Sequence, residues 1–375
     1  LQVHNSVTGA WTRKILPPGP AVLNSRFGVS VALSGDLAVV GASGVATNTG
    51  AAFIYNVSTG VLVRTLSATG GVVGDQFGSA VAFSGKRVLV SAVARDSAKG
   101  AVYLFDATTG TQLNRFDLGA GGVASDRFGS SLAVDGNVLL VGASGRDADK
   151  GAAYLYDLTT FQQLAVLQPA ALAAGDRFGS SVALSGVQAV VGAPARASDK
   201  GGVFVIDRRD GTTVALTAPD GVAGDVFGAA VSADADKVIV GAPSKAGAGT
   251  QTGSVYLFDL HTKAFIRQVS PVDGLSNTNF GFHVSLCGNT AAVTSMGDDT
   301  LALDAGAAYL VRPLIVPLSK LTKAAAKGDF AVIVAVGDAA EVVTHDGSLD
   351  LALFVQRIDG RGLSCVRQLA PCETH

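Results

Sequence analysis

The sequence has little charge and no long apolar run. Only 15% of its 375 residues are charged, the net charge is −2, and 48% are hydrophobic. A nucleic-acid binder usually shows a basic face, which this balance does not indicate. No apolar stretch approaches the ~18 residues that a membrane helix needs, and residues 331–336 form a typical run of strand length. We therefore expect neither a nucleic-acid partner nor a transmembrane segment.

Cysteine is also scarce. The three cysteines are Cys287, Cys365 and Cys372, and none stands in a CxxC or Cys/His spacing typical of a metal site. Cys365 and Cys372 are candidates for a disulfide if they face each other across a terminal loop, which would leave Cys287 as a buried thiol. The spacing alone does not decide between the bonded and the reduced form.

Signs of catalysis are few. The five histidines are scattered, without an HExxH motif or the spacing of a catalytic triad, and no glycine-rich loop is a phosphate-binding GxxxxGK[ST] motif. Asp298 and Asp299, with Asp304 nearby, are expected to form an exposed acidic loop rather than an acid/base pair. We predict that the protein is not an enzyme.

A Phe-Gly pair recurs six times at a nearly constant interval. The pairs begin at Phe27, Phe77, Phe128, Phe178, Phe227 and Phe280, so the spacings are 50, 51, 50, 49 and 53 residues. A period of this length indicates one supersecondary unit that is copied and stacked, in a solenoid or a propeller. It overrides the several domains that length alone would suggest, and we expect a single domain over residues 1–375.

The unit that begins at Phe128 shows what is repeated. Two apolar runs, residues 131–135 and 137–143, are separated by a turn at Asp135-Gly136. A polar loop leads to a third run with alternating aromatics, residues 151–157, and a fourth run covers residues 162–167. Four short strands with tight turns predict a four-stranded antiparallel meander.

The first two runs of each unit are apolar on both faces, so such a sheet cannot stand alone. Packing of these sheets around an axis buries both faces, and small side chains are then needed near the axis. Val, Ala, Gly and Ser dominate the first two runs, whereas large aromatics stand in the third: Tyr103, Phe105, Tyr154, Tyr156, Phe204, Tyr256 and Phe258. We therefore predict an all-β, seven-bladed β-propeller of four-stranded antiparallel blades. The period-two pattern excludes a helical solenoid.

Closure of the ring involves both ends of the chain. A degenerate seventh unit begins near Phe330, and residues 3–16 look like the second half of a unit. Pairing of N- and C-terminal strands in one blade would remove a free sheet edge and lock the ring, which is the closure we predict. Two alternatives stay open: the half-blade of residues 1–18 completes its own ring, or it pairs with another subunit.

Two units carry the fullest form of the motif. Asp176-Arg-Phe-Gly179 is followed by Gly192-Ala-Pro194, and Asp225-Val-Phe-Gly228 is followed by Gly241-Ala-Pro243. These letters resemble the FG-GAP repeat, the unit of the seven-bladed propeller that heads integrin alpha chains and occurs in many secreted bacterial proteins. The resemblance covers residues 26–310 and implies binding or adhesion outside the cell.

One departure from that family concerns calcium. Its calcium-binding members carry an Asp/Asn-rich loop between the first two strands, because Ca²⁺ takes about six to eight oxygen ligands. Here those turns hold two or three residues, as in Ser34-Gly35-Asp36 and Ser84-Gly85-Lys86. We interpret them as hairpin turns and predict no metal site and no cofactor.

If the family's strand order holds, the Phe-Gly and Gly-Ala-Pro loops share one face of the ring. Loops on a rigid scaffold are where binding usually lies. The candidate binding residues on this face are Arg95, Asp96, Lys99, Arg146, Asp147, Asp149, Lys150, Arg196, Asp199, Lys200 and Lys245. The alternative is that each is only a solvated loop residue.

Other recurring residues of this face have structural interpretations. The carboxylates that precede the Phe-Gly pairs are predicted to accept backbone N–H bonds: Asp75, Asp126, Asp176 and Asp225. The six Phe side chains are predicted to be wedges between blades rather than a ligand cage.

Two functions remain open. The first is a secreted or surface-displayed binding module that recognises a protein or a glycan through the loop face. The second is a structural subunit whose N-terminal half-blade pairs with a neighbour's open blade to build a filament or a layer. An enzyme that uses the axial channel is the weakest alternative, since the side chains of the inner runs are small and apolar.

The chain begins at Leu1, so we expect a processed product whose secretion signal has been removed. A sequon for N-glycosylation stands at Asn56.

Overall fold

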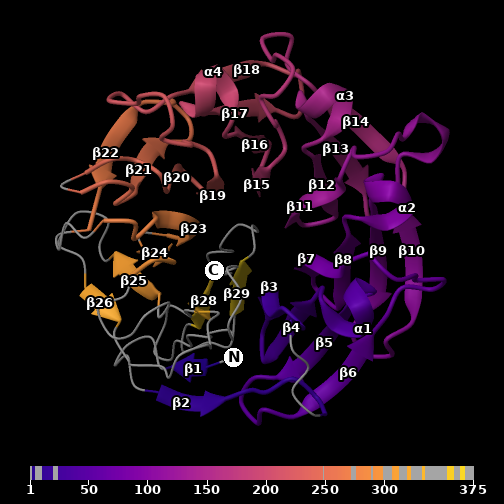
Figure 1. Cartoon of the computed structure of the whole chain (residues 1–375). Helices are drawn as coiled ribbons and strands as arrows, with labels where there is room; N and C mark the ends of the chain where they lie inside the picture. The colour runs from indigo at the N-terminus through magenta and orange to yellow at the C-terminus, as the bar shows by residue number, and fades with distance from the viewer. Residues whose placement is uncertain are drawn as a thin grey trace.

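The computed structural model describes residues 2–4, 11–19, 24–247, 249–271, 276–288, 290–298, 306–311, 319–321, 332–333, 353–358 and 364–367. Within these residues, six four-stranded antiparallel sheets stand around a common axis (Figure 1). We call them blades 1 to 6 in chain order. The first strand of each blade lies next to the axis and the fourth lies at the outer rim (Figure 1). The predicted all-β propeller of four-stranded antiparallel blades is confirmed, with a different blade count.

Each blade of the first half begins at its Phe-Gly pair. Blade 1 contains β3 (Phe27–Ser34), β4 (Leu37–Ala42), β5 (Ala51–Asn56) and β6 (Leu62–Leu66). Blade 2 contains β7 (Phe77–Ser84), β8 (Arg87–Ala92), β9 (Ala101–Asp106) and β10 (Gln112–Phe116). Blade 3 contains β11 (Phe128–Asp135), β12 (Val138–Ala143), β13 (Ala152–Asp157) and β14 (Gln163–Leu167), and is preceded by the 3₁₀ turn η1 (Gly119–Gly121).

The second half repeats this order. Blade 4 contains β15 (Ser181–Ser185), β16 (Gln188–Ala193), β17 (Gly202–Asp207) and β18 (Thr213–Leu216). Blade 5 contains β19 (Ala230–Asp234), β20 (Lys237–Ala242), β21 (Ser254–Asp259) and β22 (Phe265–Val269). Blade 6 contains β23 (Phe280–Cys287), β24 (Thr290–Ser295), β25 (Ala307–Val311) and β26 (Ser319–Leu321). Short helical turns follow the second strand in four blades: α1 (Val45–Asn48), α2 (Arg95–Ala98), α3 (Arg146–Asp149) and α4 (Arg196–Asp199).

Side-chain size places the strands along the radius of each blade. The second and third strands are buried along nearly their whole length, because neighbouring blades cover both their faces. The large aromatics stand in the third strand, where the Phe of the Phe-Gly pair packs edge-on against them. Phe128 and Tyr154, for example, have ring centroids 5.6 Å apart. The predicted taper, with small side chains at the axis and large ones further out, is confirmed.

Backbone hydrogen bonds and a close glycine contact join neighbouring blades. The turn after the second strand accepts N–H bonds from the next Phe-Gly segment, as in Arg177 N to Asp149 O at 2.7 Å and Phe178 N to Lys150 O at 3.1 Å. A Cβ on Gly142 would lie 2.0 Å from the carbonyl oxygen of Gly179 in the next blade. Glycine at position 142 is therefore required by the approach of the neighbouring blade. The Phe side chains are buried against their own blade, and it is their backbone that bridges to the preceding one.

Two-residue turns connect the first and second strands. Ser34 pairs with Leu37, and Asp234 pairs with Lys237 across these turns. The interpretation as hairpin turns is confirmed. Asp234 is buried, and its Oδ2 accepts the Gly288 N–H of blade 6 at 2.5 Å, so this carboxylate joins two blades.

The prediction of seven four-stranded blades is wrong, because the described strands give six. The other strands form a five-stranded mixed sheet in the order β2 (Trp11–Lys14), β1 (Gln2–His4), β27 (Val332–Ile333), β28 (Leu353–Ile358) and β29 (Ser364–Arg367). In it, β27 is parallel to both β1 and β28. Parallel neighbours cannot be joined by a tight hairpin, so this sheet is not a copy of the repeated meander.

Closure of the ring by these terminal strands stays a prediction. Gln2 of β1 pairs with Val332 of β27. Phe330, where the degenerate unit is expected to begin, lies outside the described residues, as do most residues after Val311. Cys287 is buried in β23, as expected. Cys372 lies outside the described residues, so its disulfide with Cys365 also stays a prediction.

Candidate functional site

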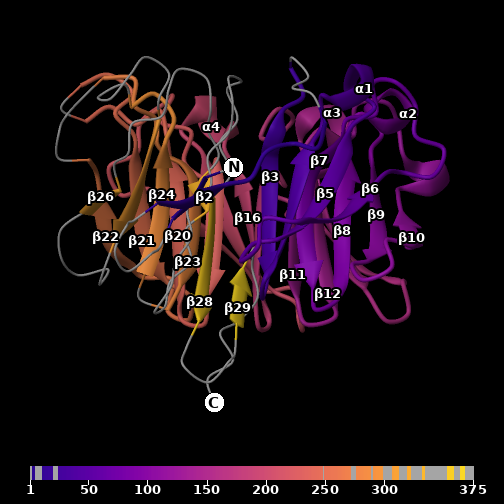
Figure 2. The same ribbon diagram turned by 90° about the horizontal axis from the view of Figure 1, so that it is seen from below.

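One face of the ring gathers the loops that sequence placed together. Figure 2 shows α1 to α4 on the same side of the ring, opposite the turns that join first and second strands. The segments that lead into the Phe-Gly pairs lie on this side too, because Gln76 N donates to Asn48 O at 2.8 Å and Phe77 N to Thr49 O at 3.0 Å. We call this side the loop face. The prediction that both kinds of loop share one face is confirmed.

The four helical turns of the loop face are left-handed. In α3, the φ angles of Asp147, Ala148 and Asp149 are 52°, 57° and 58°. Three consecutive residues have the same conformation in α1, α2 and α4. A left-handed conformation costs roughly 1–2 kcal/mol for each non-glycine residue. The hydrogen bonds to the next blade hold these turns in place, and backbone strain of this kind clusters at functional sites.

A cation from α2, α3 and α4, and Lys245 after β20 of blade 5, reaches a buried carboxylate of the same blade. Arg146 Nη1 lies 2.7 Å from Asp126 Oδ2 and donates to the Gly121 carbonyl oxygen at 2.6 Å. The hydrogen bond to Asp126 outweighs burial and raises the pKa of Arg146 above its ordinary value. The same pair recurs as Arg95 with Asp75 at 2.7 Å, Lys245 with Asp225 at 3.1 Å and Arg196 with Asp176 at 3.8 Å.

The carboxylates of these pairs also fix the backbone before the Phe-Gly segment. Asp75 Oδ2 accepts the Val72 N–H at 2.9 Å, and Asp126 Oδ2 accepts the Val123 N–H at 2.8 Å. Equivalent bonds run from Ala173 to Asp176 and from Val222 to Asp225. The predicted structural role of these four carboxylates is confirmed.

Blade 5 encloses its cation most deeply. Lys245, expected as an exposed loop residue, is only 7% exposed. Its Nζ lies 3.1 Å from Asp225 Oδ2 and 3.3 Å from Asp220 Oδ2. Tyr256 donates its hydroxyl to Asp220 Oδ1 at 2.7 Å. Burial opposes the charge of Asp220, but the bonds from Tyr256 and Lys245 lower its pKa; burial and Asp220 raise the pKa of Tyr256.

The more exposed candidate residues are distributed around the rim. Lys99, Lys150, Asp199 and Lys200 lie at equivalent places on the turns of three blades. Asp96 pairs with Arg115 at 3.1 Å, and Asp149 lies 3.8 Å from Arg127. Because Figure 1 shows these turns spread over successive blades, the candidates do not converge on one point. They form a repeated, mixed-charge surface.

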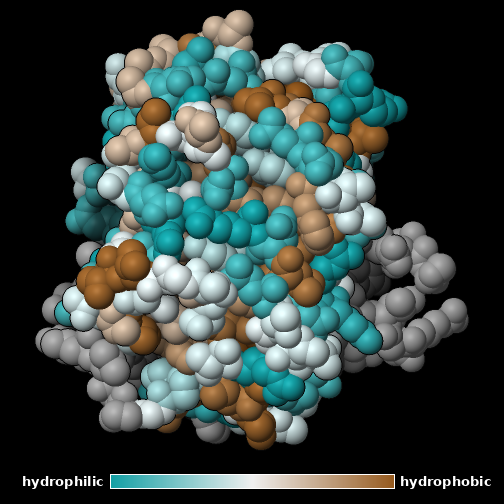
Figure 3. Space-filling model, turned by 90° about the vertical axis from the view of Figure 1, so that its right-hand side faces the viewer, coloured by the Kyte–Doolittle hydropathy of each residue, from teal (hydrophilic) through white to brown (hydrophobic). Residues whose placement is uncertain are grey.

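Exposed valines accompany these charges on the loop face. They precede the Phe-Gly pairs at repeated positions, with exposed fractions of 55% for Val72, 68% for Val73, 56% for Val123 and 56% for Val222. On the outer side of the ring, hydrophobic patches are small and separated by hydrophilic ones (Figure 3). Sequence reasoning missed these valines, although their constant place before the motif could have revealed them.

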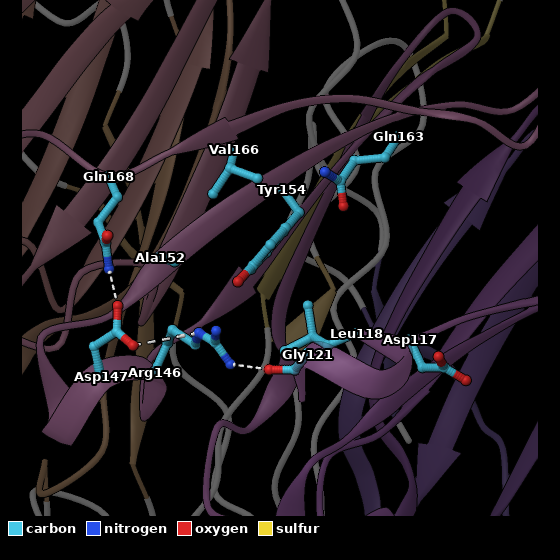
Figure 4. Close-up of a pocket in the computed structure, with 10 residues that line it drawn as sticks. All are labelled: Asp117, Leu118, Gly121, Arg146, Asp147, Ala152, Tyr154, Gln163, Val166 and Gln168. Carbon is cyan, nitrogen blue, oxygen red and sulfur yellow. Dashed lines mark hydrogen bonds and ion pairs between the residues drawn. The ribbon is translucent and has the colours of Figure 1, made fainter. Parts of the chain in front are cut away.

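A cleft of about 290 Å³ opens at the rim of blade 3. Figure 4 shows Tyr154 of β13 and Gln168, which follows β14, facing Arg146 and Asp147 of α3, with Gly121 and Leu118 beside them. Gln168 Nε2 donates to Asp147 Oδ2 at 2.8 Å. The sequence indicated only Arg146 and Asp147 here, because the cleft depends on how η1 and β14 meet.

The acidic loop of blade 6 differs from its prediction. Asp298 is not exposed: it is 1% accessible, and its Oδ2 accepts the Tyr309 hydroxyl at 2.6 Å. Asp299 and Asp304 lie outside the described residues. Within the described part of the chain, no three His, Cys, Asp or Glu residues come together as metal ligands would. No helix among the described residues is long and apolar enough to cross a membrane.

Comparison with known protein families identifies the repeats. Six segments match the sequence model of the FG-GAP repeat: residues 13–55, 61–105, 119–156, 161–206, 211–258 and 266–311. Together they cover more than half of the chain. Most begin near an outer strand and end in the third strand of the next blade, and the first begins in β2.

Solved structures and curated proteins add little. The chain is similar to the crystal structure of the computationally designed Ika8 protein, with 20% identity and a TM-score of 0.48 over 71% of this chain and 67% of that one. No curated protein matches the chain.

Proposed function

Because this chain belongs to the FG-GAP repeat family, we propose that it is a non-catalytic binding module that recognises a protein or a glycan through its loop face. The observation that carries the proposal is the repeated set of exposed valines and charges on that face. Val72, Val123 and Val222 are each more than half exposed at equivalent positions. Exposed apolar side chains rimmed by polar ones are typical of interaction sites.

The geometry of the loop face supports recognition by rigid loops. The left-handed turns α1 to α4 are held by hydrogen bonds to the next blade, so they are positioned before a ligand arrives. Preorganised loops lose less conformational entropy on binding than mobile ones. Secretion or display at the cell surface is part of the proposal and rests on the resemblance to the family.

A non-catalytic role fits the inner strands. In the first strands of the six blades, the charged or imidazole side chains among described residues are Asp135, Asp234 and His283. Asp135 and Asp234 accept backbone N–H bonds from the next blade, at Gly186 and Gly288. These two carboxylates therefore join neighbouring blades, which leaves few ionisable groups for acid/base chemistry at the axis.

The test is a glycan array together with capture of partners from the native surroundings, followed by titration of the hit. We expect the triple variant Val72→Asp, Val123→Asp and Val222→Asp to weaken binding at least tenfold. The control is Val61→Asp, because Val61 is 60% exposed in a turn on the opposite side. Equal affinity of the triple variant and the control would contradict recognition through the loop face.

A second candidate is a structural subunit that assembles by exchange of terminal strands. The observation in its favour is that β1 pairs with β27, with Gln2 opposite Val332. Pairing between backbone strands is the interaction that a strand donated by a neighbour can supply. The oligomeric state of a truncated chain tests this candidate.

A further inference from the structure

The side chain of Tyr154 lines the cleft of blade 3. The side chain belongs to β13 and the residue is only 6% exposed. Its hydroxyl makes no hydrogen bond within the described residues, yet it borders the cleft (Figure 4). A hydroxyl that borders a cleft and has no partner within its own blade is free to donate to an acceptor from outside.

Other blades show which acceptor suits this position. In blade 5, the equivalent Tyr256 donates to the carboxylate of Asp220, and in blade 6 Tyr309 donates to the carboxylate of Asp298. Asp220 stands seven residues before Phe227, and the residue seven before Phe128 in blade 3 is Gly121. Blade 3 therefore lacks the carboxylate that blade 5 places against its tyrosine, and the cleft occupies that space.

The cation of the blade 5 cluster is retained in blade 3. Arg146 takes the place of Lys245, and it donates to the Gly121 carbonyl oxygen as Lys245 donates to that of Asp220. Lys245 also lies 3.3 Å from the Asp220 carboxylate. A carboxylate in the cleft would meet the same two kinds of group, a phenol hydroxyl and a cation.

The acidic side chains of the cleft already have partners. Asp147 lies 3.5 Å from Arg146 Nε and accepts the Gln168 amide, and its side chain is 52% exposed. Asp117 lies 3.0 Å from Arg115 Nε. Solvent and these partners reduce the repulsion that the two carboxylates exert on an incoming anion.

We propose that the cleft of blade 3 binds a carboxylate group, which accepts the Tyr154 hydroxyl and lies near Arg146. The group comes from an aspartate or glutamate side chain of a partner, or from a small free carboxylic acid. The volume of about 290 Å³ is close to the smallest ligand pockets and accommodates a side chain of this size. The inference does not depend on the ligand of the loop face.

The test is a titration followed by NMR of protein labelled with ¹³C-tyrosine. The probes are N-acetyl-aspartate N-methylamide, which represents a side chain in a partner, and acetate, which represents a free acid. We expect the Tyr154 signal, assigned with Tyr154→Phe, to shift with saturation, while the signal of Tyr103 stays in place. Tyr103 is the matched control because its hydroxyl is fully buried and therefore out of reach of the probes. A shift with aspartate alone identifies a partner's side chain, and a shift with both probes identifies the group itself.

Gly121→Asp supplies the missing carboxylate from within the chain. A Cβ at Gly121 meets no atom within 4 Å, so the substitution has room. We expect it to raise the melting temperature and to weaken binding of the probe at least tenfold. Unchanged binding in Gly121→Asp would overturn the proposal. So would equal affinity for the asparagine analogue of the probe, since a neutral amide would then serve as well as a carboxylate.

Discussion

At the residue scale, some of the few charges of this chain hold loops in place inside blades 2 to 5. Arg95, Arg146 and Lys245 form ion pairs with carboxylates that precede the Phe-Gly pairs. The Asp234 carboxylate accepts a hydrogen bond from the next blade. The recurrence of Asp before Phe-Gly predicted half of this arrangement. Arg95, Arg146 and Lys245 were predicted as binding residues, and their pairing with these carboxylates was missed because the partners lie about 20 residues apart in sequence, where only the meander brings them close.

The Arg146 pair predicts unequal effects of two neighbouring carboxylates. We expect Asp126→Asn to destabilise the fold by about 2–3 kcal/mol, because Asp126 is buried and its loss leaves Arg146 with a poorer partner. Asp147→Asn is the control, and its half-exposed carboxylate should change stability by less than about 0.5 kcal/mol. Urea unfolding of both variants measures the difference, and equal losses would contradict the structural role of Asp126.

His283 predicts a loss of stability in mild acid. Burial lowers its pKa from 6.5 to about 4, and its Nδ1 has no hydrogen-bond partner among the described residues. Between pH 6.5 and 4 the unfolded chain therefore binds a proton that the folded chain does not. Stability should fall as the pH drops through this window, by up to about 3 kcal/mol. His283→Gln should flatten the fall in urea unfolding midpoints, whereas an unchanged pH profile would show that another group is responsible.

At the element scale, the local sequence specifies each strand but does not specify the contact between neighbouring blades. Alternating runs and turn residues predicted the meander, including the two-residue turn after Ser34. The left-handed turns α1 to α4 were not predicted, since Asp, Ala and Ser have no preference for three consecutive positive φ angles. The next blade imposes that conformation through hydrogen bonds to residues such as Asp149 and Lys150.

The close contact between neighbouring blades predicts a large loss of stability when one methyl group is added there. Gly192→Ala would place a Cβ 2.1 Å from the carbonyl oxygen of Gly228, so blades 4 and 5 would have to separate. We expect a loss of about 2–3 kcal/mol, typical of an overpacked core. Gly121→Ala is the control, because its Cβ would meet nothing within 4 Å. Thermal or urea unfolding compares the two, and a tolerated Gly192→Ala would mean that the blades can move apart at little cost.

At the scale of the whole molecule, the terminal strands decide how the ring ends. The N-terminal segment is tied to blade 1, since the Tyr55 hydroxyl donates to the Leu16 carbonyl oxygen at 2.9 Å and Ile15 is buried. The first FG-GAP match begins in β2, a strand of the mixed terminal sheet, and the interpretation of residues 1–18 as a half-blade stays a prediction. The count of seven regular blades failed because the last unit departs from the repeat.

Removal of residues 1–18 separates the two proposed functions. For a binding module, we expect the truncated chain to lose stability and to keep its oligomeric state, because contacts such as Tyr55 with Leu16 are internal. For a structural subunit, the same deletion abolishes assembly, since the donated strand is gone. Light scattering of the full and truncated chains measures the oligomeric state of each. A full-length monomer that stays monomeric after truncation would end the strand-exchange candidate.

The sequence by itself determined the repeat, the four strands of each blade and the all-β class, because these follow from local periodicity and from turn residues at fixed intervals. The tertiary structure alone decided the mixed terminal sheet, the burial of Lys245 and Asp298, and the cleft beside Tyr154. Each of those features depends on which distant segments meet. Such meetings are set by packing of blade against blade, and the short-range pattern of a repeat does not encode them.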